Sequence, residues 1–389
     1  MAYRLEDFVD IETNDFNDDA NDIISMCKRH NNSKREFLFV DKIQAKHIPT
    51  KFSDFRKLTD TLYDKINTTF SPKGRILIIG FAETATALSS RIMEKFCYSR
   101  EHESDDIWYI QTTRRTVKKA KPIEFLEEHS HATEQKLYWN PATSDIDTII
   151  IIDDEITTGN TVINMVRLLK QFYPKAKYHC ASILNWQNDD NRKRFADNNI
   201  TATAVITGKL KESVPVMNDI TEKAYNDTYA VYGTNRLSQY LIDRPYQKSG
   251  GTELFLTGCD REKFKSYLRF LKKAFSENVA YNKDKKYLIV GTEECMYPAI
   301  ILSSMFKNSV CQSTTRSPIS VSDTDEYLIN DETSLYSNYG TYTVHLYDIP
   351  DNTYDEIILV TDMPTRKMNI QLNNLANIKN IPRNTMLGV

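Results

Sequence analysis

The chain has 389 residues, of which 50 are basic and 53 acidic, giving a formal net charge of −3. This length predicts two domains that each bury a core, and the near-neutral charge argues against general attraction to nucleic acid or to a membrane surface. The six cysteines lack CxxC or Cys/His spacing, residues 1–23 are acidic and polar without the pattern of a signal peptide, and no apolar run approaches the ~20 residues of a membrane span. We therefore expect a cytosolic protein without disulfides or structural zinc.

Short apolar runs alternate with amphipathic stretches along the chain. The predicted strands are residues 35–43, 75–81, 106–113, 147–154, 178–186, 285–292 and 355–362. Apolar residues at helical spacing predict helices over 84–96 and 160–173. This alternation indicates an α/β fold with a parallel sheet flanked by helices, and ligands of such folds bind beyond the carboxyl ends of the strands.

The stretch IIIIDDEITTGNT, residues 149–161, joins a strongly apolar strand to two acids and a turn. The pattern predicts a buried strand that ends at Asp153 and Asp154, followed by a Thr157–Thr161 turn into a helix. A helix start offers unpaired N–H groups to a phosphate, and Gly159 allows a close approach. The two acids then face hydroxyl groups or a divalent cation, as a sugar phosphate would provide. Each feature alone is also common as an ordinary strand end or helix cap.

These 13 positions resemble the phosphoribosyl-pyrophosphate signature of type I phosphoribosyltransferases. The resemblance implies that Asp153 and Asp154 hold the ribose hydroxyls and, indirectly, Mg²⁺, and that a surrounding loop binds the 5′-phosphate. The residues implied in phosphate binding are Glu155, Ile156, Thr157, Thr158, Gly159, Asn160 and Thr161.

Other parts of that family can be matched to this chain. The strand that ends at Gly80 is followed by a candidate pyrophosphate loop of Phe81, Ala82, Glu83 and Thr84. The basic residues that come next are Arg114, Arg115, Lys118, Lys119 and Lys121. The resemblance implies a hood that closes over pyrophosphate here, with Arg114 and Arg115 as catalytic residues, whereas an isolated run of charge is usually a solvated surface.

Several residues are candidates for contact with a base or with the hood. His129 and His131 could suggest a metal site, yet no third ligand is evident, so contact from a closing loop is preferred. Trp186 ends a predicted strand, where such enzymes place an aromatic ring against the base, and a place in the core is equally compatible. Lys46 and His47 are further candidates for the base or acceptor side.

The chain also resembles a narrower group, the phosphoribosyltransferase-like proteins of bacterial tellurium-resistance-associated gene clusters. Residues 35–52 and 125–133 resemble its amino-terminal segment and hood, and Thr315–Pro318 spells the TRSP motif of its second domain. The resemblance implies a four-part organisation. The parts are an N-terminal extension at 1–34, a phosphoribosyltransferase-like domain at 35–235, a linker at 236–251 and a TRSP-like α/β domain at 252–389.

The second half repeats the first in outline. Residues 287–306, 314–318 and 355–365 echo the strand-glycine, Thr-Thr-Arg and strand-aspartate segments at nearly equal spacing, which predicts a degenerate second copy. The alternative is that two α/β domains merely look alike. The copy lacks a Thr-Gly-x-Thr turn, so we do not expect it to bind phosphoribosyl pyrophosphate. Its predicted pocket comprises Glu293, Glu294, Arg316, Ser317 and Asp362.

The resemblance favours an enzyme that transfers phosphoribose from magnesium phosphoribosyl pyrophosphate to a base-like acceptor, releasing pyrophosphate. Such displacement depends on placement and charge stabilisation, so no strong nucleophile is required. The alternative is a regulatory protein that senses phosphoribosyl pyrophosphate or nucleotides without catalysis. A homodimer and partner proteins from the same gene cluster are the expected associations, and nucleic acid is not expected. The sequence does not identify the acceptor.

Overall fold

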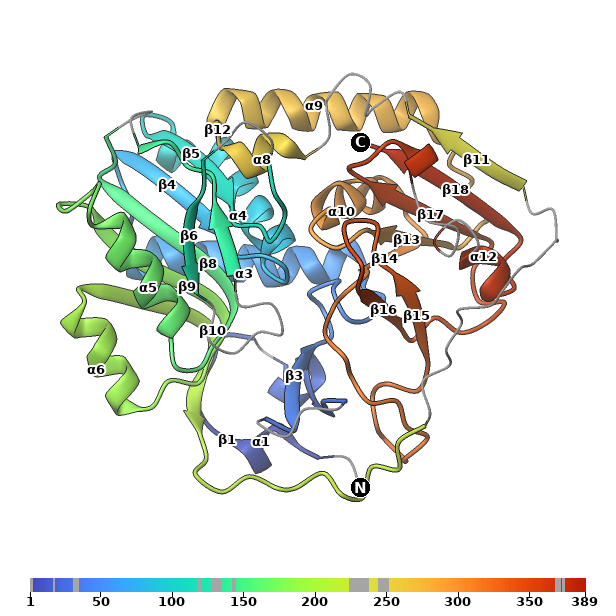
Figure 1. Ribbon diagram of the computed structural model, residues 1–389, viewed down its shortest axis with the longest axis horizontal. Helices are drawn as coiled ribbons and strands as arrows, with labels where there is room; N and C mark the ends of the chain where they lie inside the picture. The colour runs from blue at the N-terminus through green and yellow to red at the C-terminus, as the bar shows by residue number, and fades with distance from the viewer. Residues whose placement is uncertain are drawn as a thin grey trace.

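The computed structural model describes residues 3–16, 18–30, 35–117, 121–126, 134–141, 145–223, 238–243, 252–367, 372 and 375–389. Two sheets with helices packed on them form the body of the protein (Figure 1). Within the described ranges, each helix is too short or too polar to cross a bilayer.

The first sheet has seven strands in the order β1-β10-β9-β8-β4-β5-β12. Its strands are β1 (Val9–Asn14), β4 (Arg75–Gly80), β5 (Asp106–Gln111), β8 (Thr148–Ile156), β9 (Lys177–Asn185), β10 (Ile200–Leu210) and β12 (Cys259–Asp260). The five central strands are parallel, and the two edge strands are antiparallel to their neighbours. Its helices are α3 (Phe52–Thr69), α4 (Thr86–Tyr98), α5 (Asn160–Leu169) and α6 (Asp189–Asp197). The apolar runs at 75–81, 106–113, 147–154 and 178–186 therefore form the parallel sheet that their pattern predicts, whereas the run at 35–43 forms β3 (Phe37–Asp41) of a separate antiparallel hairpin.

The second sheet has five parallel strands in the order β11-β18-β17-β13-β14. They are β11 (Ser238–Ile242), β13 (Tyr287–Gly291), β14 (Ser309–Ser313), β17 (Glu356–Thr361) and β18 (Arg383–Gly388). The helices in this part of the chain are α8 (Glu253–Thr257), α9 (Arg261–Asn278), α10 (Met296–Met305) and α12 (Leu375–Ile378), with the short 3₁₀ helix η3 (Thr365–Lys367). Helix α8 contacts β5 of the first sheet. Figure 1 shows the long helix α9 lying across the top of both sheets.

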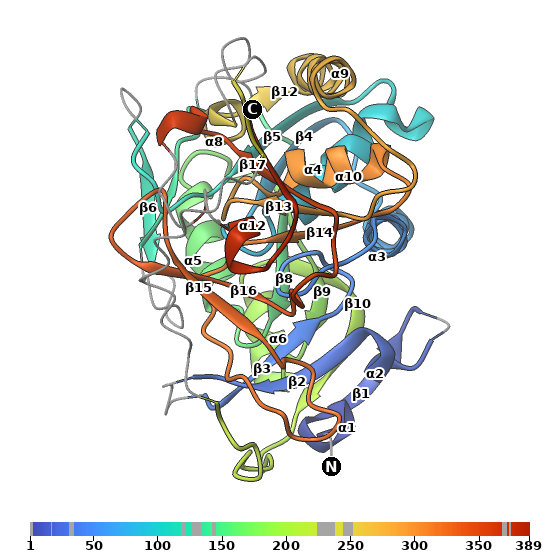
Figure 2. The same cartoon turned by 90° about the vertical axis from the view of Figure 1, so that its right-hand side faces the viewer.

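Smaller elements lie around the strand ends. They are α1 (Leu5–Phe8), α2 (Ala20–Ile23), β2 (Ile24–Lys28), β3 (Phe37–Asp41), η1 (Arg100–His102), β6 (Ile123–Leu126), β7 (Glu134–Leu137), β15 (Glu332–Tyr336) and β16 (Thr343–Tyr347). The pairs β2–β3, β6–β7 and β15–β16 form separate antiparallel hairpins. In Figure 2 the β2–β3 hairpin lies at the lower end of the molecule, near the N-terminus.

The two halves repeat one another in detail, which confirms a second, degenerate α/β domain. The central strands β8, β4 and β5 match β17, β13 and β14 in order. Equivalent hydrogen bonds occur in both halves, with donor–acceptor distances that agree within 0.3 Å. Phe81 N donates to Ile152 O (3.0 Å) as Thr292 N does to Val360 O (3.1 Å), and Ala82 N donates to Thr112 Oγ1 (2.8 Å) as Glu293 N does to Thr314 Oγ1 (2.9 Å). Val117 N donates to Tyr138 Oη (3.1 Å) as Ile319 N does to Tyr347 Oη (2.8 Å). This alignment makes Glu83 equivalent to Glu294, Arg114 to Arg316, and Asp154 to Asp362.

The halves share one apolar core rather than standing apart. A single buried cluster contains Ile78 and Met93 of the first half together with Tyr297, Ile300 and Val360 of the second. The predicted domain ranges are crossed at two places by strand pairing. Strand β1, within the predicted extension 1–34, pairs with β10, and β12, within 252–389, pairs with β5 of the first sheet. Strand β11, within the predicted linker 236–251, belongs to the second sheet.

Candidate active site

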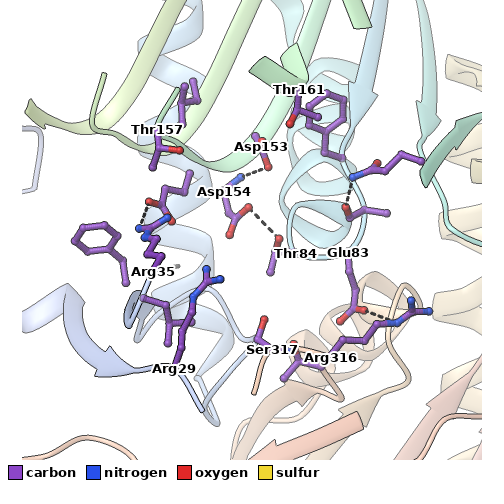
Figure 3. Close-up of a pocket in the computed structure, with 18 of the residues that line it drawn as sticks. Arg29, Arg35, Glu83, Thr84, Asp153, Asp154, Thr157, Thr161, Arg316 and Ser317 are labelled. Atoms are coloured by element: carbon purple, nitrogen blue, oxygen red, sulfur yellow. Dashed lines mark hydrogen bonds and ion pairs between the residues drawn. The ribbon is translucent and has the colours of Figure 1, made fainter. Parts of the chain in front are cut away.

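A cavity of about 520 Å³ opens where the carboxyl ends of β4 and β8 face the β2–β3 hairpin and the second half of the chain. Figure 3 shows its walls: Asp153 and Asp154 near the centre, Glu83 and Thr84 on one side, Arg29 and Arg35 on the other, and Arg316 and Ser317 below. Strand ends of a parallel sheet are the usual ligand position of this fold class. The cavity is therefore built from both halves of the protein.

The turn from β8 into α5 has the geometry of an anion-binding loop. Gly159 has φ +72°, and helix α5 begins directly after it, so the first helical N–H groups point into the cavity end of the turn. A Cβ at Gly159 would lie 2.2 Å from Phe195 Cε1, so only glycine fits here. We call residues 157–161 the phosphate loop. Glu155 and Ile156, also predicted to surround a phosphate, are instead the last residues of β8, although both line the cavity.

Asp153 and Asp154 lie just before the phosphate loop and line the cavity together. The strand continues through them, because Asp153 is in register with Ser182 of β9. Thr84 Oγ1 donates to Asp154 Oδ1 at 2.9 Å, which links the acid pair to the loop after β4. Burial and the nearby Glu155 carboxylate raise the pKa of Asp154, against the hydrogen bonds from Asp153 and Thr84. Such a carboxylate gains from a bound cation or hydroxyl donor.

The loop after β4, residues 81–84, lies beside the acid pair, and its Ala82–Glu83 peptide bond is cis. Lys46 Nζ donates to Glu83 Oε1 at 2.5 Å, and both side chains are buried. Burial alone would raise the pKa of Glu83, but the positive charges of Lys46, Arg114 and Arg316 lower it overall. The carboxylate is thus occupied by protein cations, which leaves the loop backbone and Thr84 to meet a ligand. Lys46 itself is fully buried and does not line the cavity, contrary to its predicted role at the acceptor.

The TRSP motif lines this cavity and not a second one. Arg316 lies over the Tyr342 ring at 3.6 Å and is 3.6 Å from Glu83 Oε2 and 3.4 Å from Glu293 Oε2. Burial and the Glu83 charge raise the pKa of Glu293 to about 7. Ser317 follows at the cavity wall (Figure 3). The predicted second-domain pocket is therefore wrong as a separate site, because its arginine and serine reach across to the first half.

The remaining members of that predicted pocket bind Arg115. Its guanidinium is 2.7 Å from Asp362 Oδ2 and 3.2 Å from Glu294 Oε2, and it lies over the Tyr339 ring at 4.6 Å. Arg115 therefore holds the two halves together and does not line the cavity, which corrects its predicted catalytic role. Arg114, one position earlier, does line the cavity.

Trp186 is a core residue. It is 2% exposed, its ring lies 5.1 Å from that of Phe39, and it is absent from the cavity wall, which excludes the predicted contact with a base. His47 does line the cavity. Lys121 is exposed and away from it. Lys118, Lys119, His129 and His131 lie outside the described residues.

The structure adds cavity residues that sequence reasoning missed. Arg29, Arg35 and Phe39 come from the β2–β3 hairpin, and Tyr342 and Thr343 from the second half. The hairpin was hard to foresee because β2 lies in the segment predicted as an N-terminal extension. A short apolar run at residues 23–27, interrupted only by Ser25 and close to the predicted strand at 35–43, was the available indication.

Two family models match the chain. Residues 23–209 match a family model described as phosphoribosyl transferase, and residues 256–378 match one described as the TRSP domain C-terminal to it. The first match starts ahead of the predicted boundary at residue 35 and includes the hairpin. No curated protein matches the chain.

Part of the chain is similar to solved phosphoribosyltransferases at low identity. Adenine phosphoribosyltransferase from Saccharomyces cerevisiae is 12% identical, with 47% of this chain and 94% of that chain covered and a TM-score of 0.33. The enzyme from Giardia lamblia is 10% identical with the same coverage and TM-score. Orotate phosphoribosyltransferase from Aeropyrum pernix is 14% identical, covering 40% of this chain and 70% of that chain, with a TM-score of 0.24. On the two family matches, the chain contains a phosphoribosyl transferase domain followed by a TRSP domain.

Proposed function

We propose that the protein is a phosphoribosyltransferase that binds phosphoribosyl pyrophosphate in this cavity and transfers phosphoribose to a base-like acceptor. The observation that carries the proposal is the convergence of the phosphate loop, the acid pair and the loop after β4 on one cavity. The loop after β4 is distant in the sequence from the acid pair and the phosphate loop, and capping or strand termination does not require it to meet them around open space.

The parts fit the donor in one orientation. The 5′-phosphate would accept hydrogen bonds from the N–H groups of the phosphate loop. Asp153 and Asp154 would accept from the two ribose hydroxyls and so fix the ring. The pyrophosphate would lie along residues 81–84, with the positive charges of Arg114 and Arg316 nearby. The side of the cavity beside Arg29 and Arg35 is then left for the acceptor (Figure 3).

The reaction is a displacement at the anomeric carbon. A ring nitrogen of the acceptor forms the new bond to C1 of the ribose, the C1–O bond breaks, and pyrophosphate leaves with the electron pair. The nitrogen's proton passes to solvent. Positive charge builds on the ribose in the transition state while negative charge grows on the leaving group. The acid pair stabilises the first, and Arg114 and Arg316 stabilise the second.

The residues present fit Mg²⁺. The ion prefers oxygen ligands and is commonly held by one or two carboxylates together with substrate phosphates, and Asp153 and Asp154 offer such carboxylates at the cavity. Among the described residues no group of three or more His, Cys, Asp or Glu side chains could hold a metal, so the substrate would supply further ligands. When bound, Mg²⁺ would offset the charge of the departing pyrophosphate.

The test is the double substitution Asp153→Asn with Asp154→Asn. We expect loss of calorimetrically detectable binding of magnesium phosphoribosyl pyrophosphate, with an unchanged circular dichroism spectrum. The matched control is Asp189→Asn with Asp190→Asn, another adjacent acid pair, at the start of α6 and outside the cavity. Equal affinity in the two double variants would refute the site.

Turnover is tested by following pyrophosphate release with phosphorus NMR across a panel of bases. Release with a base would establish the transferase. Tight binding of the donor without release would instead identify a sensor of phosphoribosyl pyrophosphate, the alternative class.

A further inference from the structure

The cavity wall opposite the loop after β4 is built by the β2–β3 hairpin. Figure 3 shows Arg29 and Arg35 on this wall, across the acid pair from Glu83 and Arg316. If the donor lies as proposed, its pyrophosphate lies on the side of Glu83 and Arg316, and the opposite face of its anomeric carbon is turned toward Arg29 and Arg35. The hairpin wall therefore faces the incoming acceptor. The charge and polarity of its side chains indicate which chemical groups the acceptor has.

Arg29 is a cation whose side chain has no partner among the residues that the structure describes. Its guanidinium makes no hydrogen bond or ion pair with any residue in the described ranges, and its Nε atom is completely buried. The backbone of Arg29 is fixed, because its N–H donates to Glu36 O at 2.6 Å and the residue bridges to Ile319 of the second half. Burial and the neighbouring Arg35 lower the pKa of Arg29, against the opposing charges of Glu155 and Asp154. A partly buried cation of this kind is costly unless an anion pairs with it.

Arg35, on the same wall, has protein partners for its guanidinium. Its Nη2 atom donates to Glu155 Oε1 at 2.7 Å. The guanidinium also lies 4.9 Å from the Phe37 ring centroid and 5.3 Å from that of Phe39. The charge of Arg35 is thus offset within the protein. Arg29 has no such carboxylate or ring contact among the described residues, so we expect a bound anion to pair with Arg29 rather than with Arg35.

His47 adds a neutral polar group to the same cavity. The side chain is 4% exposed, and neither ring nitrogen has a hydrogen-bond partner in the part of the chain that the structure describes. Burial, helped by the adjacent Lys46 charge, lowers the pKa of His47 to about 3. At neutral pH the ring is therefore an uncharged donor and acceptor. Together with the apolar surfaces of Leu38 and Phe39, it suits the edge and face of a planar heterocycle.

From this wall we infer that the acceptor is a planar nitrogen heterocycle bearing a carboxylate, with the carboxylate bound by Arg29. A planar guanidinium forms two parallel hydrogen bonds to a carboxylate, which an uncharged amide cannot reproduce. His47 hydrogen-bonds to the ring edge, and Phe39 contacts the ring. The inference rests on the proposed function, because it uses the donor's position to identify the acceptor side.

The experiment compares acceptors that differ only in the anionic group. The protein saturated with magnesium phosphoribosyl pyrophosphate is titrated calorimetrically with nicotinate and nicotinamide, and with orotate and its carboxamide. In at least one pair we expect the carboxylate to bind about tenfold or more tightly than the amide, the value of a charge-assisted hydrogen bond. Arg29→Gln should remove that preference, because it weakens carboxylate binding more than amide binding. The control, Arg56→Gln, changes an exposed arginine of α3 outside the cavity and should behave as wild type.

The outcomes separate the two claims. Equal affinity for carboxylate and amide in both pairs, or no binding by either pair, would overturn the inference about the acceptor. The same holds if Arg29→Gln keeps the preference. Donor binding is measured first and alone. If the wild-type protein does not bind magnesium phosphoribosyl pyrophosphate, the proposed function fails, and the inference fails with it.

Discussion

Gly159→Ala separates the role of the phosphate loop in binding from its role in folding. Alanine at φ +72° is strained by about 1–2 kcal/mol. Its Cβ would also stand 2.2 Å from Cε1 and 2.7 Å from Cζ of Phe195, a ring that is 3% exposed and has little room to move. Overpacking of this kind costs about 1–3 kcal/mol. We therefore expect the free energy of unfolding to fall by about 3 kcal/mol.

Gly74→Ala is the matched control. Gly74 has φ +85°, so alanine is strained there as well, but its Cβ would first meet Asp147 Oδ2 at 2.9 Å, the end of a side chain that can shift. Gly74 lies outside the cavity. We expect a loss of about 1–2 kcal/mol of stability from the strain, with no change in ligand affinity.

The assay combines urea unfolding with calorimetric titration of magnesium phosphoribosyl pyrophosphate under conditions where both variants are folded. Displacing the phosphate loop should weaken hydrogen bonds from backbone N–H groups to a charged phosphate, lowering affinity by about 10- to 100-fold. Gly159→Ala should show this loss and Gly74→Ala should not. If both variants bind the donor as the wild type does, the loop does not hold the phosphate, and the orientation of the donor proposed above is wrong.

Two further predictions concern buried charge. Arg115→Met leaves the carboxylates of Glu294 and Asp362 buried without their cation, so the free energy of unfolding in urea should fall by about 3 kcal/mol or more. The control is Arg56→Met, which changes a 62%-exposed side chain and should cost about 0.5 kcal/mol or less. A similarly small loss for both variants would contradict the role of Arg115 between the two halves. Burial lowers the pKa of His179 to about 3 from 6.5, so its contribution to stability is present above pH 6.5 and is lost as the pH falls towards 3. When the pH is lowered from 6.5 to 5, the free energy of unfolding of His179→Gln should fall by about 1.5 kcal/mol less than that of the wild type. If the two proteins lose stability in parallel over this range, His179 makes no such contribution.

The phosphate loop and acid pair could be predicted because all their parts lie within residues 149–161. A strand, two acids and a glycine turn into a helix leave little freedom for their relative placement, and the structure keeps that arrangement. The central strands β4, β5, β8, β9, β13 and β17 could be predicted for the same local reason, since each apolar run is long enough to be buried. Strands β10, β14 and β18 of the two sheets were not among the predicted strands.

The rest depended on how distant segments pack. Arg114 and Arg115 are adjacent in sequence, yet one lines the cavity and the other binds Asp362, because the chain runs along the contact between the two halves. Nothing local distinguishes the two. Likewise Arg316 enters the first-half cavity only because the two sets of strand ends face each other. A strand-end aromatic such as Trp186 could point either way, and the shared core determined its position.

The repeat also explains why one half has an open site and the other does not. Asp154 and Asp362 occupy equivalent positions, each two residues after the last residue that pairs with the neighbouring strand, Ile152 in β8 and Val360 in β17. Asp362 is buried against Arg115, Thr252 and Tyr339, and these partners lower its pKa in spite of burial. The pKa of Asp154 is instead raised by burial, with Thr84 as its hydrogen-bond donor from the next loop.

This difference follows from an exchange between the halves. Glu294, the counterpart of Glu83, accepts from Thr113 Oγ1 at 2.6 Å and, with Asp362, holds Arg115 of the first half. Glu83 in turn pairs with Lys46 and lies near Arg316 of the second half. Arg115 therefore supplies to the second half the cation that fills its site, whereas Arg316 binds at the edge of the first cavity and leaves its centre open. An acid that the protein already neutralises has no charge left for a ligand, so a single donor should bind per chain, at Asp154.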